Sequence, residues 1–250
     1  MDQEAIFYSG TRNASSWAMR AWLALRAANF PFREVIVDIR RPQRFRNLDE
    51  IAKLSPAAAI PVLEVGGRCI FESSAIMEYA NDYCGGTLLP GDKLQRARAR
   101  SLIAWQHAGL SGICSRISFE SAFYPYKRDL TADEQAEAAR LFAHLEELLN
   151  ESAGPFLFGE PGLGDFVLAP AAIRLLRHSV GTQAFPMTER WIEAIVEHEL
   201  VAEWLEDADR LPHIWFDDYL IPGAAVDLNP VTATDRAATH ARHKWPDGTA

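Results

Sequence analysis

The stretch LSPAAAIPVLEVGGRCIFESSAIMEY, residues 54–79, decides how the first part of the chain folds. Two short apolar runs lie on either side of the dipeptide Gly66-Gly67. Because both glycines tolerate positive φ, this pattern predicts two strands joined by a tight β-hairpin turn. A proline opens the first strand, a position where a missing N–H is tolerated. A helix is expected directly after the hairpin, with Ser73 or Ser74 as its N-cap.

Upstream of the hairpin, strand and helix patterns alternate. Residues 5–9 and 33–39 predict strands, and a segment rich in helix formers, 17–26, lies between them. A looser basic segment, 40–53, leads to the hairpin. The expected order β-α-β-(α)-β-β-α is that of a thioredoxin-like α/β domain, which we place at residues 1–84.

Beyond a glycine-rich linker, nearly every segment has a helical pattern. A long amphipathic helix is expected from Lys93 to about Ser121. The segment Thr131-Ala-Asp-Glu134 has the capping-box pattern and starts a second helix that should reach Leu149. Three further helices are expected at residues 164–178, 188–198 and 199–209. We therefore expect an all-α C-terminal helical domain over residues 93–221 and a loose tail over residues 222–250.

Composition and charge narrow the class of protein. The chain has 250 residues, of which 48% are hydrophobic, so it can bury a sizeable core. The first residues lack the features of a signal peptide, and no apolar run approaches the ~18 residues of a membrane helix. Three cysteines without a CxxC pair suit a reducing cytoplasm. The net charge of −9 argues against a nucleic-acid partner, and no HExxH pattern suggests a metal site.

The hairpin stretch resembles the glutathione site of the cytosolic glutathione S-transferase superfamily. In that family the proline is cis, and the backbone of the residue before it pairs with the cysteinyl part of glutathione. The matching residues here are Ile60 and Pro61. An acidic residue and a serine, here Glu72 and Ser73, hold the γ-glutamyl amine and carboxylate in the family. The resemblance covers roughly residues 5–215 and implies a two-domain layout, glutathione as co-substrate and a homodimer.

A second motif concerns activation of the co-substrate. A free thiol with pKa ~8.5 is only about 3% ionised at pH 7, and a hydroxyl donor at a helix N-terminus can stabilise the thiolate. The stretch Asn13-Ala-Ser15-Ser16-Trp17-Ala-Met-Arg20 resembles the Ser-Ser-Cys-x-x-Arg pattern of the zeta-type transferases. By this resemblance Ser15 activates glutathione, although a slip of one residue would pass the role to Ser16. Trp17 replaces the cysteine and is counted with the glutathione-binding residues, so thiol exchange by a side chain is not expected.

A third motif, Gly162-Leu-Gly-Asp165, resembles a helix start in the family's second domain. The family places a serine or threonine at the cap, where this chain has Gly162, so half of the reciprocal hydrogen bonding is missing. Asp165 can still accept backbone hydrogen bonds at the helix start. Its expected role is in folding.

The sequence departs from the family pattern just ahead of the proline. Many members place lysine or glutamine there, whereas this chain has Ala57-Ala58-Ala59. The glycine carboxylate of glutathione would then need another partner. The basic segment offers Arg40, Arg41, Arg44 and Arg46, which otherwise form a solvated face.

An aromatic stretch near the end of the long helix is the candidate second-substrate pocket, with one basic group for an anionic electrophile. Its residues are Trp105, Arg116, Phe119 and Phe123, with His107, Tyr124 and Tyr126 nearby. Packing in the core of the helical domain is the competing interpretation. Tyr8, in the first strand, is expected to be a half-buried strand residue rather than the thiolate activator.

The sequence thus predicts a glutathione transferase in which Ser15 holds the thiolate for attack on a small apolar or anionic electrophile. An alternative is a glutathione-dependent cis–trans isomerase of the maleylacetoacetate or maleylpyruvate type, motivated by the zeta-type pattern and Arg116. A third hypothesis is a non-catalytic interaction protein that keeps the fold, motivated by Ala57-Ala58-Ala59.

Overall fold

The computed structural model describes residues 4–39, 44–109 and 117–213. Its first part is a four-stranded mixed sheet in the order β2-β1-β3-β4. The strands are β1 (Ile6–Gly10), β2 (Arg33–Val37), β3 (Val62–Val65) and β4 (Arg68–Phe71), and the helices are α1 (Ser16–Ala27), α2 (Arg44–Ile51) and α3 (Ser73–Tyr83). β1 pairs parallel with β2 and antiparallel with β3, and β3 pairs antiparallel with β4. This is the expected thioredoxin-like layout.

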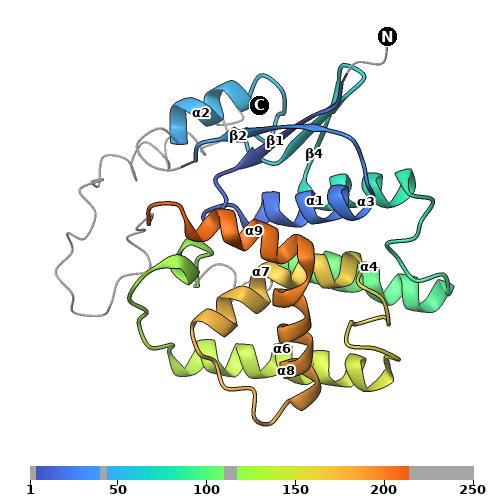
Figure 1. Cartoon of the computed structure of the whole chain (residues 1–250), viewed down its shortest axis with the longest axis vertical. Coiled ribbons are helices and arrows are strands. Elements are labelled where there is room, and N and C mark those ends of the chain that lie inside the picture. The colour runs from blue at the N-terminus through green and yellow to red at the C-terminus, as the bar shows by residue number, and fades with distance from the viewer. Residues whose placement is uncertain (1–3, 40–43, 110–116, 214–250) are drawn as a thin grey trace, which may run out of the picture.

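Two apolar clusters attach the helices to the two faces of the sheet. Successive residues of a strand point to opposite faces. Accordingly Leu63 lies in the cluster that includes α1 and α3, and Val62 lies in a second cluster with Ile51 of α2. Figure 1 shows α2 above the sheet and α1 and α3 below it.

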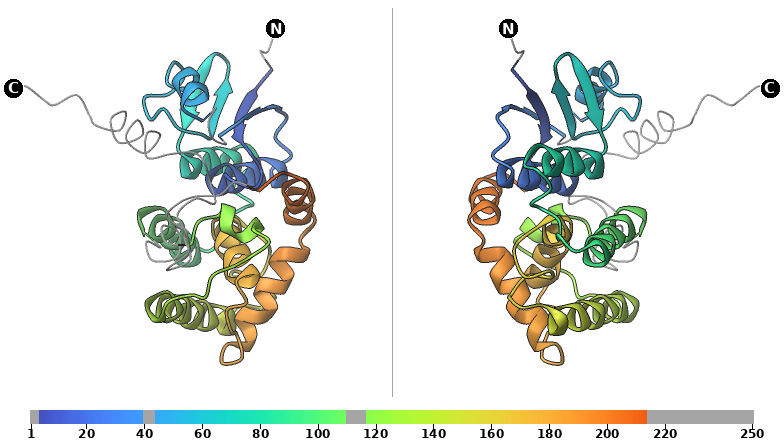
Figure 2. Two further views of the ribbon diagram at one scale, coloured as in Figure 1. Left: turned by 90° about the vertical axis from the view of Figure 1, so that its left-hand side faces the viewer. Right: turned by 90° about the vertical axis from the view of Figure 1, so that its right-hand side faces the viewer.

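The second part is helical, as expected. Its elements are α4 (Lys93–Gly109), the 3₁₀-helix η1 (Glu120–Phe123), α6 (Ala132–Glu151), α7 (Leu163–Arg177), α8 (Pro186–Glu197) and α9 (Glu199–Asp209). Nearly all of α7 is buried, so this helix is the centre of the helical part. α1 packs against α3 on one side and against α7 and α9 on the other, as Figures 1 and 2 show. The start of α1 therefore lies between the two parts of the chain.

Two local predictions were wrong. The helix expected from Lys93 to about Ser121 does not reach that far, because residues 117–119 are non-helical and a separate 3₁₀-helix follows. The N-cap of α3 is Glu72 rather than a serine, and Glu72 makes no capping bond through its side chain. Among the described helices, none has the length and hydrophobicity that crossing a membrane requires.

Candidate functional site

The first turn of α1 is built around Ser15, which is its N-cap. The Ser15 Oγ accepts a hydrogen bond from the backbone N–H of Ala18 at 3.2 Å. The first N–H groups of a helix have no partner within the helix, and together with the helix dipole they attract an anion. The residue expected to activate a thiolate thus lies where an anion is favoured.

Gly10 brings Ser15 close to the residue that precedes the proline. A Cβ atom added at Gly10 would lie 2.3 Å from Cδ1 of Ile60 and 2.6 Å from Cβ of Ser15. Both side chains therefore occupy the space that a larger residue at the end of β1 would need. The two sequence motifs, which are far apart in the chain, meet at this glycine.

Ser16 is turned toward the helical part of the chain. Its Oγ accepts a hydrogen bond from Nη2 of Arg174, in α7, at 3.2 Å. The two adjacent hydroxyls thus have different partners, one within α1 and one across the boundary between the two parts. This difference favours Ser15 over Ser16 as the residue that faces the hairpin.

A cavity of about 240 Å³ lies between the start of α1, the hairpin and α4. Its described lining is Trp17, Ala57, Ala59, Ile60, Pro61, Glu72, Ser73 and His107. Four expected glutathione-binding residues of the hairpin stretch and Trp17 therefore share one cavity. The Ile60–Pro61 peptide bond is cis, as the resemblance implied. Ser15 does not belong to this lining and is almost fully buried beside it.

Glu72 occupies a strained backbone position at the edge of this cavity. Its φ of 70° lies in the left-handed region, which a residue with a side chain rarely adopts. Such strain is concentrated at functional sites, where the surrounding structure maintains it. The Glu72 Oε2 lies 3.5 Å from the His107 Nε2, so an acidic group and an imidazole face each other across the cavity.

His107 connects the helical part of the chain to the cavity. Its ring packs edge-on against Trp17, with 5.2 Å between the ring centroids. On the other side of this pair, the Arg20 guanidinium lies 4.2 Å from the Trp17 ring. Sequence reasoning placed His107 near the second substrate rather than here. Its position in the last turn of α4 carried no signal for a contact with Glu72.

Of the expected second-substrate residues that the structure describes, Phe119 and Phe123 pack together, while Trp105 has other ring contacts. Trp105 is half-exposed on α4 and packs edge-on against His144 of α6. Phe119 and Phe123 pack against each other and are buried in the core. Arg116 lies outside the described residues. The geometry therefore favours core packing, the competing interpretation, for the two phenylalanines.

Other residues weighed from sequence have separate surroundings. The Tyr8 hydroxyl donates to Oε2 of Glu64 at 3.2 Å, and burial, with help from Glu64, raises the pKa of Tyr8. A tyrosine whose hydroxyl already donates to a carboxylate is a poor thiolate activator. Arg44 and Arg46 lie on α2, while Arg40 and Arg41 lie outside the described residues.

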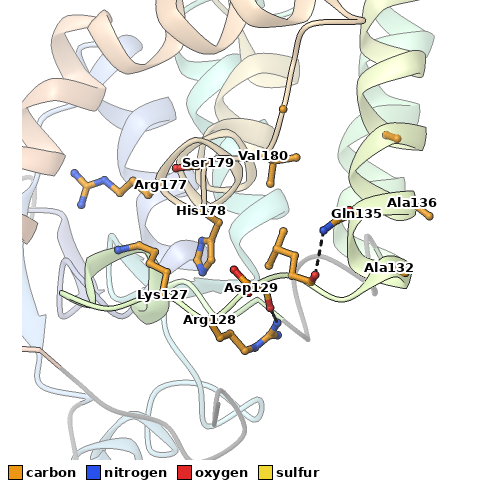
Figure 3. A pocket seen from close by; sticks show the side chains of 13 residues that line it. Lys127, Arg128, Asp129, Ala132, Gln135, Ala136, Arg177, His178, Ser179 and Val180 are labelled. Carbon is orange, nitrogen blue, oxygen red and sulfur yellow. Dashed lines mark hydrogen bonds between the residues drawn. The ribbon is translucent and has the colours of Figure 1, made fainter. Parts of the chain in front are cut away.

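A larger cavity, of about 1,100 Å³, opens in the helical part between the start of α6 and the end of α7. Figure 3 shows His178 pointing toward the segment that carries Lys127, Arg128 and Asp129. The Arg128 guanidinium is bonded to the carboxylate of Glu134 through two hydrogen bonds, so its charge is compensated. Sequence reasoning did not identify this cavity. Among the described residues, no group of three or more His, Cys, Asp or Glu side chains could hold a metal ion.

Comparisons with families of known proteins match both parts of the chain. Residues 14–82 match the family described as "Glutathione S-transferase, N-terminal domain". Residues 128–211 match "Glutathione S-transferase, C-terminal domain". The first match includes the start of α1 and the hairpin, and the second includes α6 to α9.

Curated relatives and solved structures agree with these matches. Maleylacetoacetate isomerase of Dictyostelium discoideum is 25% identical, over 81% of this chain and 98% of that protein. Glutathione S-transferase theta-1 of Mus musculus is 30% identical, over 70% of this chain and 77% of that protein. The structure of glutathione S-transferase unclassified 2 from Bombyx mori has a TM-score of 0.68 and 20% identity, over 83% of this chain and 94% of that one. Glutathione transferase F2 from Populus trichocarpa has a TM-score of 0.67 and 19% identity, over 82% and 98%.

Proposed function

The chain belongs to the glutathione S-transferase superfamily, and from this premise we propose that it is a serine-type glutathione-dependent enzyme. In this proposal the thiolate of glutathione lies at the first turn of α1, where the Ser15 hydroxyl donates a hydrogen bond to it. Stabilising the anion selectively by roughly 2.7 kcal/mol would lower the thiol pKa by ~2 units and make the thiolate the main form at pH 7. The thiolate then attacks an electrophilic carbon.

One observation carries the proposal: Ser15 is the N-cap of α1, and its side chain and that of Ile60, the residue before Pro61, both crowd the space beside Gly10. The Ser15 Oγ accepts from the Ala18 N–H and donates to no acceptor among the described residues, so its own proton can be donated to an incoming sulfur. A hydroxyl that is held at a helix start needs little reorganisation to donate to an anion.

The cavity supports a consistent placement for the rest of glutathione. The backbone of Ile60 would pair with the cysteinyl unit, and Glu72 and Ser73 would hold the γ-glutamyl end, with Trp17 as one wall. Glu72 and Ser73 both line the cavity. Binding the peptide along this wall would bring the sulfur to Ser15 and supply the proximity that a bimolecular reaction lacks. We propose that residues 1–84 bind glutathione and that residues 93–221 form the site for the electrophile.

Replacement of the two serines tests the roles of the hydroxyls. We expect Ser15→Ala to lower kcat/KM with 1-chloro-2,4-dinitrobenzene by about 100-fold, the usual scale for loss of one donor to a developing or stable anion. The pKa of the bound thiol, followed by thiolate absorbance, should rise with it. Ser16→Ala is the matched control and should change either quantity only slightly.

Isothermal titration with glutathione separates the enzymatic proposal from a non-catalytic protein. Binding with a lowered thiol pKa supports the enzyme. Binding with an ordinary thiol pKa that Ser15→Ala does not change would favour an interaction protein that keeps the fold. If Ser16→Ala has the large effect and Ser15→Ala the small one, the assignment of the two hydroxyls is reversed.

A second candidate function is cis–trans isomerisation of a maleyl-type acid by reversible addition of the same thiolate. The observation that favours it is that several curated relatives bear the name maleylacetoacetate isomerase, one of them aligned over 98% of its length. Turnover of maleylacetoacetate or maleylpyruvate, followed by loss of the cis-enone absorbance, would favour the isomerase. Activity restricted to substitution of aryl halides would favour the transferase.

We also propose that the protein is a homodimer. Exposed apolar side chains support this: Phe71 on the edge strand β4, and Leu94 and Trp105 on α4. Large exposed apolar side chains are a feature of surfaces that bind another protein. Light scattering coupled to gel filtration should give twice the chain mass of 27.9 kDa, and a single-chain mass would contradict the proposal.

We also propose that the protein is located in the cytoplasm. A thiol co-substrate and the free cysteines Cys69 and Cys84 suit a reducing compartment. Cell fractionation tests this location.

A further inference from the structure

Arg174 is a buried cation beside the first turn of α1. Its side chain comes from α7, is almost completely buried, and donates from Nη2 to the Ser16 Oγ at 3.2 Å. The guanidinium carbon lies 5.2 Å from the centre of the Phe119 ring. Ser16 is the first residue of α1, so this positive group lies next to the helix start that the proposed thiolate would occupy.

The hydrogen-bonding capacity of Arg174 is only partly used. Among the described residues, neither Nε nor Nη1 has a hydrogen-bond partner, and no carboxylate forms an ion pair with the guanidinium. Arginine remains charged in proteins, and a buried charge without a counterion is costly. A nearby anion would offset this energetic cost.

The start of α1 is the place where the charge of Arg174 can stabilise an anion. The unpaired N–H groups and dipole of α1 already create positive potential at Ser15 and Ser16. Arg174 adds a full positive charge next to Ser16, in the same region. Because the group is shielded from solvent, salt and water weaken its field less than they weaken the field of a surface arginine.

Other charged groups around the start of α1 are partly compensated or lie in other directions. In the loop before α1, Arg12 is paired with Glu34 at 2.6 Å. From α4, His107 faces Glu72 at the N-cap of α3. From α1 itself, Arg20 lies against Trp17, and from η1, Glu120 has a partner of its own.

We propose that Arg174 stabilises the thiolate of bound glutathione through its positive field, acting across the domain boundary without contacting the sulfur. This inference rests on the proposed function. It adds the Arg174 guanidinium, from the helical part, to the groups that stabilise the thiolate at the start of α1. The hydroxyl of Ser15 supplies the hydrogen bond, and Arg174 supplies long-range electrostatic stabilisation. The helical part then has a role in activating the co-substrate as well as in binding the second substrate.

Two substitutions of Arg174 separate charge from packing. Arg174→Met keeps an apolar chain of similar length and removes the buried charge, a change that proteins often tolerate. We expect it to raise the pKa of the bound glutathione thiol by about one unit, which lowers kcat/KM about tenfold on the acidic side of the profile. The difference from the unchanged protein should disappear above the thiol pKa. Arg174→Lys keeps the charge and should retain most of the shift.

One further variant serves as a control. Arg177→Gln removes another α7 arginine, whose charge is paired with Asp209 through two hydrogen bonds, and should leave the thiol pKa unchanged. Circular dichroism at each pH ensures that only folded protein is compared.

The outcomes distinguish this inference from the proposed function. If unsubstituted protein binds glutathione with an ordinary thiol pKa, the proposed function fails first. If the unsubstituted protein lowers the thiol pKa and Arg174→Met lowers it equally, only the inference about Arg174 is overturned. If Arg174→Met and Arg174→Lys raise the thiol pKa equally, the positive charge is not what matters, Arg174 has a purely structural role, and the inference is also overturned.

Discussion

At the scale of single residues, Gly10 defines the site by the side chain it lacks. It ends β1, and the space that a Cβ would fill is taken by Ile60 and Ser15. The Ile60 contact involves the flexible end of a side chain, but the Ser15 contact involves Cβ, which is fixed by the start of α1. Glycine at this position therefore allows the cis-proline strand and the α1 N-cap to approach each other.

We expect Gly10→Ala to destabilise the protein by about 1–3 kcal/mol, the usual cost of overpacking a well-filled site. It should also lower kcat/KM, because Ser15 must move away from its present position. Chemical denaturation and steady-state kinetics measure the two effects. Gly91→Ala is a suitable control, since a Cβ there would meet no atom within 4 Å. Equal behaviour of the two variants would contradict the close approach at Gly10.

At the scale of elements, α7 carries a buried acid at its start and a buried imidazole at its end. Asp165 accepts hydrogen bonds from the backbone of Leu157 and Gly162 and from Nε1 of Trp191, at 2.9–3.1 Å. Complete burial raises the pKa of Asp165 to about 6, against the opposing effect of these hydrogen bonds. The sequence prediction of a folding role for this residue agrees with its surroundings.

We expect Asp165→Asn to destabilise the protein by about 2 kcal/mol or more, because the NH₂ group that replaces one carboxylate oxygen cannot accept a hydrogen bond and would face a buried N–H donor. Thr131→Ala provides the comparison, since Thr131 makes a capping box with Glu134 on an exposed helix start. Its loss should cost about 1 kcal/mol. Thermal unfolding of both variants shows which substitution destabilises the protein more. A larger loss of stability in Thr131→Ala would argue against α7 as the centre of the helical part.

The other end of α7 predicts a dependence of stability on pH. The ring Nδ1 of His178 lies 2.7 Å from the carbonyl oxygen of Arg174, to which it donates, and burial is the main cause that lowers the pKa of His178 to about 4. Lys127 and Arg128, which line the same cavity in Figure 3, also disfavour the protonated ring. A depressed pKa means that the unfolded chain binds the proton more tightly. Stability from this group is therefore complete above pH 6.5 and is lost as the pH falls toward about 4.

Replacement by glutamine tests this dependence. His178→Gln removes the titrating group, so the decline in unfolding free energy between pH 6.5 and 4 should be smaller in the variant than in the unsubstituted protein. Urea denaturation at half-unit pH intervals measures the difference. Replacement of His144, an exposed histidine of α6, is the control and should leave the slope unchanged. Parallel pH curves for His178→Gln and the unsubstituted protein would contradict the assignment.

At the scale of the whole molecule, α9 holds the loop that leads to Ser15. Nε1 of Trp204 donates to the backbone carbonyl of Arg12 at 3.0 Å, and the Arg12 guanidinium lies 4.1 Å from the Trp204 ring. Burial lowers the pKa of Arg12, while Glu34 opposes this effect. Nδ2 of Asn13 donates to the carbonyl of Pro212. The last described helix thus contacts the segment immediately before α1.

We expect Trp204→Phe to lower stability by about 1 kcal/mol through the lost hydrogen bond. It should also weaken glutathione binding, because the loop before Ser15 is less well held. Arg26→Gln is the control, since it breaks the exposed ion pair with Glu203, and such pairs contribute little. Titration calorimetry measures the affinity for glutathione, and thermal unfolding measures the stability. An unchanged affinity in Trp204→Phe would show that α9 stabilises the protein without positioning the site.

Features encoded within a few neighbouring residues could be predicted from the sequence. The hairpin at Gly66-Gly67, the N-cap Ser15 and the capping box at Thr131 depend on local φ preferences and on side chains that reach the next turn. The alternation of elements was enough to predict a thioredoxin-like part followed by a helical part. The end of α4 and the cap of α3 were mispredicted, because local residue preferences do not fix the residue at which a helix begins or ends.

Only the tertiary structure decided which distant side chains meet. Ser16 and Arg174 are 158 positions apart, and Glu72, at the N-cap of α3, meets His107 of α4. Phe119 and Phe123 have the composition of a substrate pocket but the burial of a core. Such contacts depend on how whole helices cross and rotate against one another, and periodicity along the chain does not specify these angles. The sequence determined the parts of the candidate site, and the packing of α1 between the hairpin and α7 determined how those parts face each other.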